Sequence, residues 1–305
     1  MIVQGGEVVD QWGDTDKKIS SYSVRKSLIS ALYGIYSAEG VIDINQTLEQ
    51  MGIDDSPDPL TKEERQARVV DLLRARSGVY HPVDLETALM KRNRPARGSH
   101  APGTFWYYNN WDFNVLGTIF EKETGLKIGD AFYQRIAKPI GMQDFQPGDV
   151  YYLPGPISVH PAYHFEITAR DLARFGLLYL RHGRWNNRQI VPGAWVDKST
   201  HASEMLKVNG VDVGGYEYLW WVEYGGVHTF PEASLPSMFS ARGAGGHYLL
   251  VIPSLDLVIV HRTNNDPPVK DARTAAERAD REIVSTAQFG HLVRLILDAQ
   301  TATQR

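Results

Sequence analysis

The sequence has no cysteine among its 305 residues. Disulfides, thiolate metal ligands and a cysteine nucleophile are therefore excluded, which fits a reducing compartment without excluding the periplasm. The chain also lacks a surplus of positive charge, because 32 Lys and Arg stand against 36 Asp and Glu. We therefore expect neither nucleic acid nor an anionic membrane as a partner. No apolar run approaches the roughly 18 residues that a membrane span requires.

Motifs of several large enzyme classes are missing as well. The sequence contains no G-x-S-x-G nucleophile elbow, no G-x-x-x-x-G-K-[ST] phosphate loop and no strand-bound G-x-G-x-x-G. The first residues, MIVQGGEVVDQWGD, have neither the basic nor the apolar region of a signal peptide. We expect a cytoplasmic protein, with a periplasmic location as the alternative if the N-terminus has been trimmed.

Hydrophobic periodicity predicts strands towards both ends of the chain and helices between them. Helices are expected at 23–40, in the second half of 57–76, and at 111–124, 129–137, 169–181 and 281–299. Strands are expected as a hairpin at 2–12 and as short runs at 216–224, 248–252 and 255–261. The pattern predicts an α/β (α+β) fold, an antiparallel sheet flanked by helices. Residues 1–50 and 195–305 are expected to form the sheet-containing domain. Residues 51–194 are expected to form a mostly helical inserted domain, with the active site at the interface.

The tetrapeptide Ser23-Val-Arg-Lys26 begins the first of these helices. Residues three apart share one face of a helix, so the amine of Lys26 can reach the hydroxyl of Ser23. A serine becomes an effective nucleophile when a base removes its proton, and a partly desolvated lysine can be that base. The alternative interpretation is structural, with Ser23 as a helix N-cap and Lys26 as a solvated residue of the first turn.

The surroundings of this tetrapeptide resemble the S-x-x-K serine hydrolases, which include the class C β-lactamases, the penicillin-binding DD-peptidases and related esterases. The matching segments, in chain order, are Glu39-Gly-Val-Ile-Asp43, Leu72-Leu-Arg-Ala-Arg-Ser-Gly78, Tyr108-Asn-Asn110 with Leu116-Gly117, Thr168-Ala-Arg-Asp-Leu-Ala-Arg-Phe-Gly176, Gly183-Arg-Trp185 and Tyr216-Glu-Tyr-Leu-Trp-Trp221. The resemblance implies a β-lactamase/transpeptidase-like fold and an acyl-enzyme formed on Ser23. It implies no cofactor.

The second motif of the family is Tyr-x-Asn, which Tyr108-Asn109-Asn110 matches. By resemblance, Tyr108 moves the proton to the leaving group and Asn110 binds the substrate. The register is open, because Tyr107-Tyr108-Asn109 also fits the pattern, although the distance to the following Leu-Gly favours Tyr108. The alternative is a buried aromatic residue followed by a helix cap.

The third motif has its best counterpart in Ala-Arg-Gly-Ala-Gly-Gly-His, residues 241–247. Ala244 stands where the family has a Lys or His, the cation that binds a substrate carboxylate, and Arg242 is a candidate to replace it. Gly245 and Gly246 let a substrate lie close to the backbone. The backbone amides of Ser23 and His247 are expected to form the oxyanion hole. The alternative is a simple glycine-rich turn.

Two histidines, His160 and His164, have the spacing of a zinc pair, with Glu166 nearby. Pro161 argues against the helix that such a pair requires, so we expect no metal site and place both histidines in a loop near the cleft.

We therefore expect a serine hydrolase that acts on small-molecule carboxylic esters or small amides. Two features favour these substrates over β-lactams: the third-motif cation is missing, and aromatic residues are numerous. The alternatives are a true β-lactamase or DD-peptidase, and a non-catalytic penicillin-binding-like protein. Oligomeric state and natural substrate do not follow from the sequence.

Overall fold

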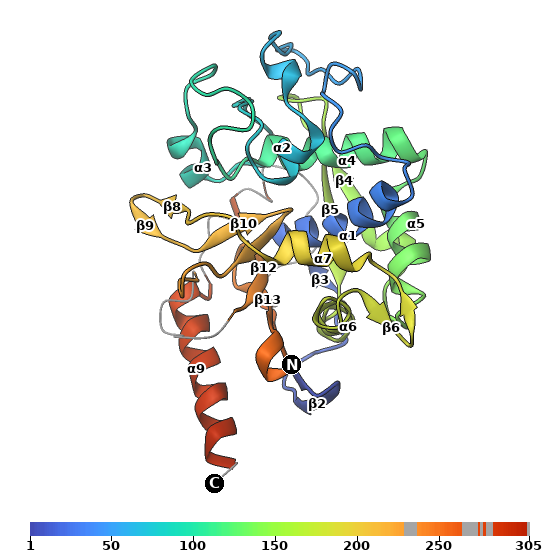
Figure 1. The fold of residues 1–305 in the computed structure, drawn as a ribbon, viewed down its shortest axis with the longest axis vertical. Coiled ribbons are helices and arrows are strands. Elements are labelled where there is room, and N and C mark those ends of the chain that lie inside the picture. The colour runs from blue at the N-terminus through green and yellow to red at the C-terminus, as the bar shows by residue number, and fades with distance from the viewer. Residues whose placement is uncertain (229–236, 264–273, 275–276, 279–282, 304–305) are drawn as a thin grey trace.

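A seven-stranded antiparallel sheet forms the centre of the fold, with the strand order β10-β11-β12-β13-β14-β1-β2 (Figure 1). The computed structural model describes residues 1–228, 237–263, 274, 277–278 and 283–303. The strands are β1 (Ile2–Gln4), β2 (Glu7–Asp10), β10 (Gly215–Glu217), β11 (Trp220–Val222), β12 (Phe239–Gly243), β13 (His247–Ile252) and β14 (Leu257–His261). Strands β1 and β14 pair directly, so the predicted joining of the two β-structured ends in one antiparallel sheet is confirmed.

Side chains alternate between the two faces of this sheet, as the pleat requires. On β13, Leu249 points into the main core, whereas Leu250 joins a smaller cluster with Phe289 of helix α9 (Thr286–Thr303). Because both faces are covered, the central strands consist of nearly continuous apolar residues.

Helix α6 (Ala169–Leu180) covers the main-core face of strands β13 and β14. The Oγ1 of Thr168 accepts a hydrogen bond from the backbone of Asp171, which caps the helix as the sequence predicts. A Cβ atom at Gly176 would lie 2.6 Å from Val258, so the glycine permits the close contact between helix and sheet.

Helix α1 (Arg25–Ala38) runs through the middle of the molecule, and its residues from Arg25 to Tyr36 are all buried. Helices α4 (Asn110–Thr124), α5 (Ile128–Phe132) and α7 (Gly193–Thr200) pack around it. The Tyr33 hydroxyl donates a hydrogen bond of 2.6 Å to the carbonyl of Leu116 and so ties α1 to α4. The central position of α1 fixes its N-terminal turn between the helices and the large sheet (Figure 1).

A second, three-stranded sheet has the order β3-β5-β4 and leads directly into α1. Its strands are β3 (Ile19–Ser20), β4 (Val150–Leu153) and β5 (Ala162–Ile167). The short elements are α2 (Val69–Leu73), α3 (Ala88–Asn93), β6 (Arg184–Trp185), β7 (Arg188–Gln189), β8 (Lys207–Val208) and β9 (Val211–Asp212). No helix in the described part of the chain is long and apolar enough to cross a membrane.

Three expectations from the sequence need correction. The helix expected within 57–76 is confined to the short α2. The strand expected at 216–224 is two strands, because Tyr218 and Leu219 adopt positive φ values of 42° and 71° and form a turn. The last helix begins at Thr286 rather than 281, and residues 281–282 lie outside the described part.

The division of the chain into two domains stays a prediction. Strands β4 and β5 belong to the segment expected to be mostly helical. Helix α6 belongs to the same segment but packs on the large sheet.

Candidate active site

The candidate nucleophile lies in a tight turn at the start of the central helix. A 3-10 turn, Tyr22–Val24, precedes α1, and Tyr22 has a φ of 46°, which is uncommon for a residue with a large side chain. The half-buried Ser23 lines a cavity. Its interpretation as a helix N-cap is wrong, because Val24 is the N-cap of α1 and no side chain caps this helix.

Lys26 lies one turn further along and faces the nucleophile. Its Nζ donates a hydrogen bond of 2.6 Å to the Oγ of Ser23. The side chain is 1% exposed, so the interpretation of Lys26 as a solvated residue is wrong. Burial, and to a lesser extent the charge of Arg25, lowers the pKa of Lys26 well below its ordinary value of 10.5. A lysine in these surroundings gives up its own proton more readily than a free lysine, and the neutral amine can take a proton from serine.

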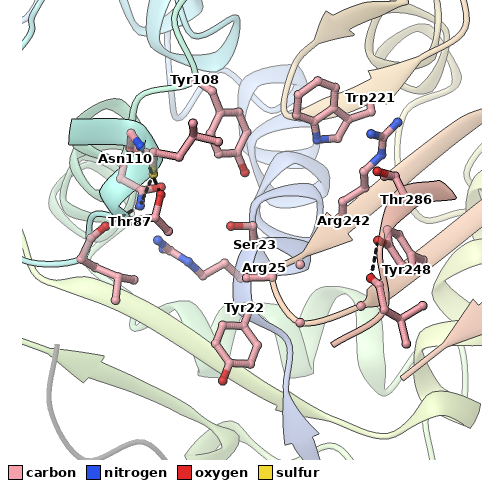
Figure 2. Close-up of a pocket in the computed structure, with 18 of the residues that line it drawn as sticks. Tyr22, Ser23, Arg25, Thr87, Tyr108, Asn110, Trp221, Arg242, Tyr248 and Thr286 are labelled. Carbon is pink, nitrogen blue, oxygen red and sulfur yellow. Dashed lines mark hydrogen bonds between the residues drawn. The ribbon is translucent and has the colours of Figure 1, made fainter. Parts of the chain in front are cut away.

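Tyr108 lies on the other side of the same serine. Figure 2 shows its hydroxyl directed towards Ser23, and its ring lies 4.8 Å from the Nζ of Lys26. Burial raises the pKa of Tyr108 to about 12, although the Ser23 hydroxyl acts in the opposite direction. Near neutral pH the phenol therefore keeps its proton. It is suited to pass a proton on rather than to be the first base, a role that fits Lys26 better.

The two possible registers of the second motif place different residues in the cavity. Tyr108 and Asn110 line it. Tyr107 instead donates a hydrogen bond of 2.9 Å to the carbonyl of Met90. Asn109 caps α4 by accepting a hydrogen bond from the backbone amide of Trp111 at 3.1 Å. The structure thus places Tyr108 and Asn110 in the cavity wall, where Asn110 also donates a hydrogen bond to the carbonyl of Leu85.

A buried hydrogen bond holds this end of α4 in position. Ser77, in the segment that resembles Leu-Leu-x-His-x-Ser-Gly, donates from its Oγ to Asp112 of α4 at 2.5 Å. Both side chains are fully buried, so they fix the start of the helix that follows Tyr108.

The hairpin between β12 and β13 forms the wall opposite α4, and Ala244, Gly245 and Gly246 line the cavity there. The φ values of Gly245 and Gly246, 83° and 101°, favour glycine. A Cβ atom on Gly243 would lie 2.5 Å from the carbonyl oxygen of Ser21, so this glycine lets the hairpin approach the nucleophile turn.

His247 pairs with Gly243 next to the turn of this hairpin. Its imidazole stacks on Tyr22 at 5.2 Å and accepts a hydrogen bond of 3.0 Å from Arg262. It is not among the described residues that line the cavity. The expected oxyanion hole, formed by the amides of Ser23 and His247, stays a prediction.

Arg242 lies on β12, where its guanidinium stacks at 4.7 Å over the ring of Trp221. Its Nε donates a hydrogen bond of 3.1 Å to Ser240. Burial lowers the pKa of Arg242 to about 9, so the side chain keeps its charge at neutral pH. The structure therefore brings a cation to the hairpin wall, although Ala244 is uncharged.

These side chains surround a cavity of about 540 Å³ (Figure 2). In Figure 2, Asn110 and Thr87 lie on one side of Ser23, and Arg242 and Trp221 lie on the other. Apolar side chains complete the wall: Leu85, Leu89, Met90 and Val284. No Asp or Glu is among the described residues that line the cavity, which therefore presents cations without a matching anion.

Arg25 and His164 are two of the several cavity residues that were not predicted as site residues. Arg25 stands inside the Ser23–Lys26 tetrapeptide, and a charged residue in an otherwise apolar helix is a signal that could have been followed. His164 lines the cavity but lies in strand β5, so its expected position in a loop is wrong. His160 does lie in a loop, where it contacts Thr118 and a backbone carbonyl and does not line the cavity. No group of His, Asp or Glu that could hold a metal ion occurs in the described ranges.

The cavity and its residues occur in a fold that many solved structures share. A 6-aminohexanoate-dimer hydrolase candidate from Bacillus anthracis is 20% identical, with a TM-score of 0.65 over 96% of this chain and 78% of the other. A β-lactamase from Mycobacterium bovis is 20% identical, with a TM-score of 0.56 over 85% and 84%. A family VIII carboxylesterase is 16% identical, with a TM-score of 0.60 over 87% and 84%.

These likenesses establish the β-lactamase/transpeptidase-like fold, and their low identity carries no assignment of substrate. A search of curated proteins finds no match. The family model described as Beta-lactamase matches residues 1–282, which is most of the chain. The chain therefore belongs to the β-lactamase family of serine hydrolases.

Proposed function

We propose that this protein hydrolyses carboxylic esters or small amides through an acyl-enzyme on Ser23. One observation carries the proposal: the buried amine of Lys26 lies 2.6 Å from the Ser23 hydroxyl at the edge of an open cavity. A lysine with a lowered pKa beside a serine is an activated nucleophile. Incubation with a fluorophosphonate probe, followed by peptide mass spectrometry, tests whether Ser23 is the reactive residue.

The reaction follows from the positions of these groups. Lys26 takes the proton of Ser23 as its oxygen attacks the substrate carbonyl, and backbone amides hold the oxyanion that forms. As the bond to the leaving group breaks, Tyr108 passes a proton to the departing oxygen or nitrogen. A water molecule then attacks the acyl-enzyme and gives a proton to the same basic groups. The serine oxygen takes a proton back as the acid product leaves, which restores Ser23.

Substrate preference follows from the hairpin wall. In a β-lactam, the carboxylate is attached on the leaving-group side of the bond that breaks, where the family cation binds it. Ala244 offers no charge there, so we propose esters or small amides as the preferred substrates. Arg242 lines the same side and is the observation that favours the alternative, a true β-lactamase or DD-peptidase.

The Ala244→Lys variant tests this preference. A charge-assisted hydrogen bond is worth about 1.5–3 kcal/mol, so the ratio of cephalosporin to neutral ester hydrolysis should rise about tenfold to a hundredfold. The measurement is kcat/KM for a chromogenic cephalosporin and for 4-nitrophenyl butyrate. Arg242→Ala should lower cephalosporin turnover selectively if Arg242 already supplies the charge. Efficient cephalosporin turnover by the wild type, unchanged in Arg242→Ala, would contradict this assignment of the third motif.

A further inference from the structure

Arg25 is a buried cation that has no acidic partner in the part of the chain that the structure describes. It is 1% exposed, and its guanidinium lies 4.4 Å over the ring of Tyr163. One terminal nitrogen donates a hydrogen bond of 3.2 Å to Asn114. The other has no acceptor at hydrogen-bonding geometry among the described residues, although the phenol of Tyr163 lies close enough to act on the pKa of Arg25. No carboxylate is among the described groups that act on the pKa of Arg25; besides burial, these are the phenols of Tyr163, Tyr108 and Tyr151. Buried charges are normally paired, so an arginine in this state has capacity for an anion.

A second buried arginine in the same protein shows the contrast. Arg262 donates hydrogen bonds to the backbone carbonyls of Ile19, Ser20 and Ile167 and to the ring of His247. Its donors are used within the protein, as expected for an arginine with a structural role. The free nitrogen of Arg25 is therefore not a general property of buried arginines in this fold.

An independent observation comes from another element of the same cavity wall. His164, on β5, is 1% exposed, lines the cavity, and has no partner for either ring nitrogen in the described part of the chain. An imidazole with an unused N–H can donate a second hydrogen bond to an anion. In Figure 2 the side chain of Arg25 extends from α1 towards the side of the cavity that carries Asn110 and Thr87.

The remaining lining limits what kind of anion fits. Leu85, Leu89 and Met90 line the cavity, and such apolar side chains suit methylene groups. A guanidinium binds a carboxylate through charge-assisted hydrogen bonds, and here the uncommitted terminal nitrogen of Arg25 and a ring N–H of His164 can donate them together. Arg25 and Asn110 lie on one side of Ser23, and Arg242 lies on the other. Because the leaving group is assigned to the side of Arg242, the wall with Arg25 faces the acyl part of the substrate.

We propose that Arg25, assisted by His164, binds a carboxylate at the far end of the substrate acyl chain, so that the preferred substrates are monoesters or monoamides of aliphatic dicarboxylic acids. This inference rests on the proposed function, because it assumes that the acyl group is transferred to Ser23. It assigns the carboxylate to the acyl side, which is distinct from the leaving-group side at the hairpin.

The test uses esters that share a leaving group and differ in the terminal carboxylate. We compare 4-nitrophenyl hydrogen adipate with 4-nitrophenyl hexanoate, and the hydrogen suberate with the octanoate for a longer reach. For the wild type, kcat/KM should be about tenfold to a hundredfold higher for the anionic member of at least one pair. Arg25→Met should remove this ratio, and Arg25→Lys, which keeps the charge but not the forked geometry, should restore part of it. Arg188→Met, an exposed arginine on β7, is the control for the change in net charge.

Binding provides a readout that does not depend on turnover. Adipate titrated into wild-type protein in a calorimeter should bind, and Arg25→Met should weaken the binding at least tenfold. If none of the four esters is hydrolysed, but adipate binds to the wild type and more weakly to Arg25→Met, the proposed function fails and the subsite stands. If the wild type hydrolyses the anionic and the neutral ester of each pair equally, and adipate does not bind, Arg25 has a structural role only. The wild-type comparison remains decisive even if the Arg25 variants fail to fold.

Discussion

The Ser23→Ala variant is expected to lose on the order of 10⁴-fold or more of kcat for any ester that the wild type hydrolyses. The loss is this large because the other groups of the site act on the serine oxygen. Lys26 hydrogen-bonds to it, and the hydroxyl of Tyr108 is directed towards it. Without that oxygen no acyl-enzyme can form, so the base has no hydroxyl to deprotonate and the proton relay has no reaction to serve. Fluorophosphonate labelling should disappear together with turnover.

The control for Ser23→Ala is Ser37→Ala, near the other end of the same helix and outside the cavity lining. It should keep wild-type turnover, and circular dichroism should show the same fold for both variants. Near-wild-type hydrolysis by a clean preparation of Ser23→Ala would overturn the assignment of the nucleophile.

The Lys26→Arg variant is expected to lose about 10²- to 10⁴-fold of kcat, the range of a positioned general base. Guanidinium does not give up its proton in the working pH range, so the variant keeps a positive charge but has no base. The lowered pKa of Lys26 has a second consequence. Wild-type kcat/KM should rise with pH through an ionisation well below that of a free lysine, because the deprotonated amine is the active form.

The measurement is a pH profile of kcat/KM with 4-nitrophenyl butyrate for the wild type, Lys26→Arg and Lys198→Arg. Lys198 is an exposed residue on α7 and is the matched control for the same change of side chain. An active Lys26→Arg variant with an unchanged pH profile would remove Lys26 from the role of base.

The sequence predicted those features that depend on local spacing. The apolar period of α6, its Thr168 cap and the short apolar runs of β13 and β14 were all readable, because each is determined by neighbouring residues. The Ser23–Lys26 contact was readable for the same reason, since one helical turn brings the two side chains together.

Several features that depend on distant parts of the chain were not predicted, although the joining of the two β-structured ends in one sheet was. The turn at Tyr218 is stabilised from outside, because its carbonyl accepts a hydrogen bond from Ser30 of α1. Strand β3 is two residues long and exists only because β5 pairs with it. Arg25 and His164 meet one cavity from different elements, and no spacing in the sequence indicates that both are buried there.

The buried amine beside the nucleophile also has a consequence for folding thermodynamics. In the unfolded chain Lys26 titrates near 10.5, whereas burial lowers its pKa in the native state. Between these two values the unfolded chain holds more protons, so this residue makes the free energy of unfolding rise with pH. Its contribution is most unfavourable below the native pKa and vanishes above 10.5, a slope that urea midpoints measured against pH would report. The burial that provides the serine with a base thus also lowers the stability of the fold below pH 10.5, and catalysis and folding are linked through one proton.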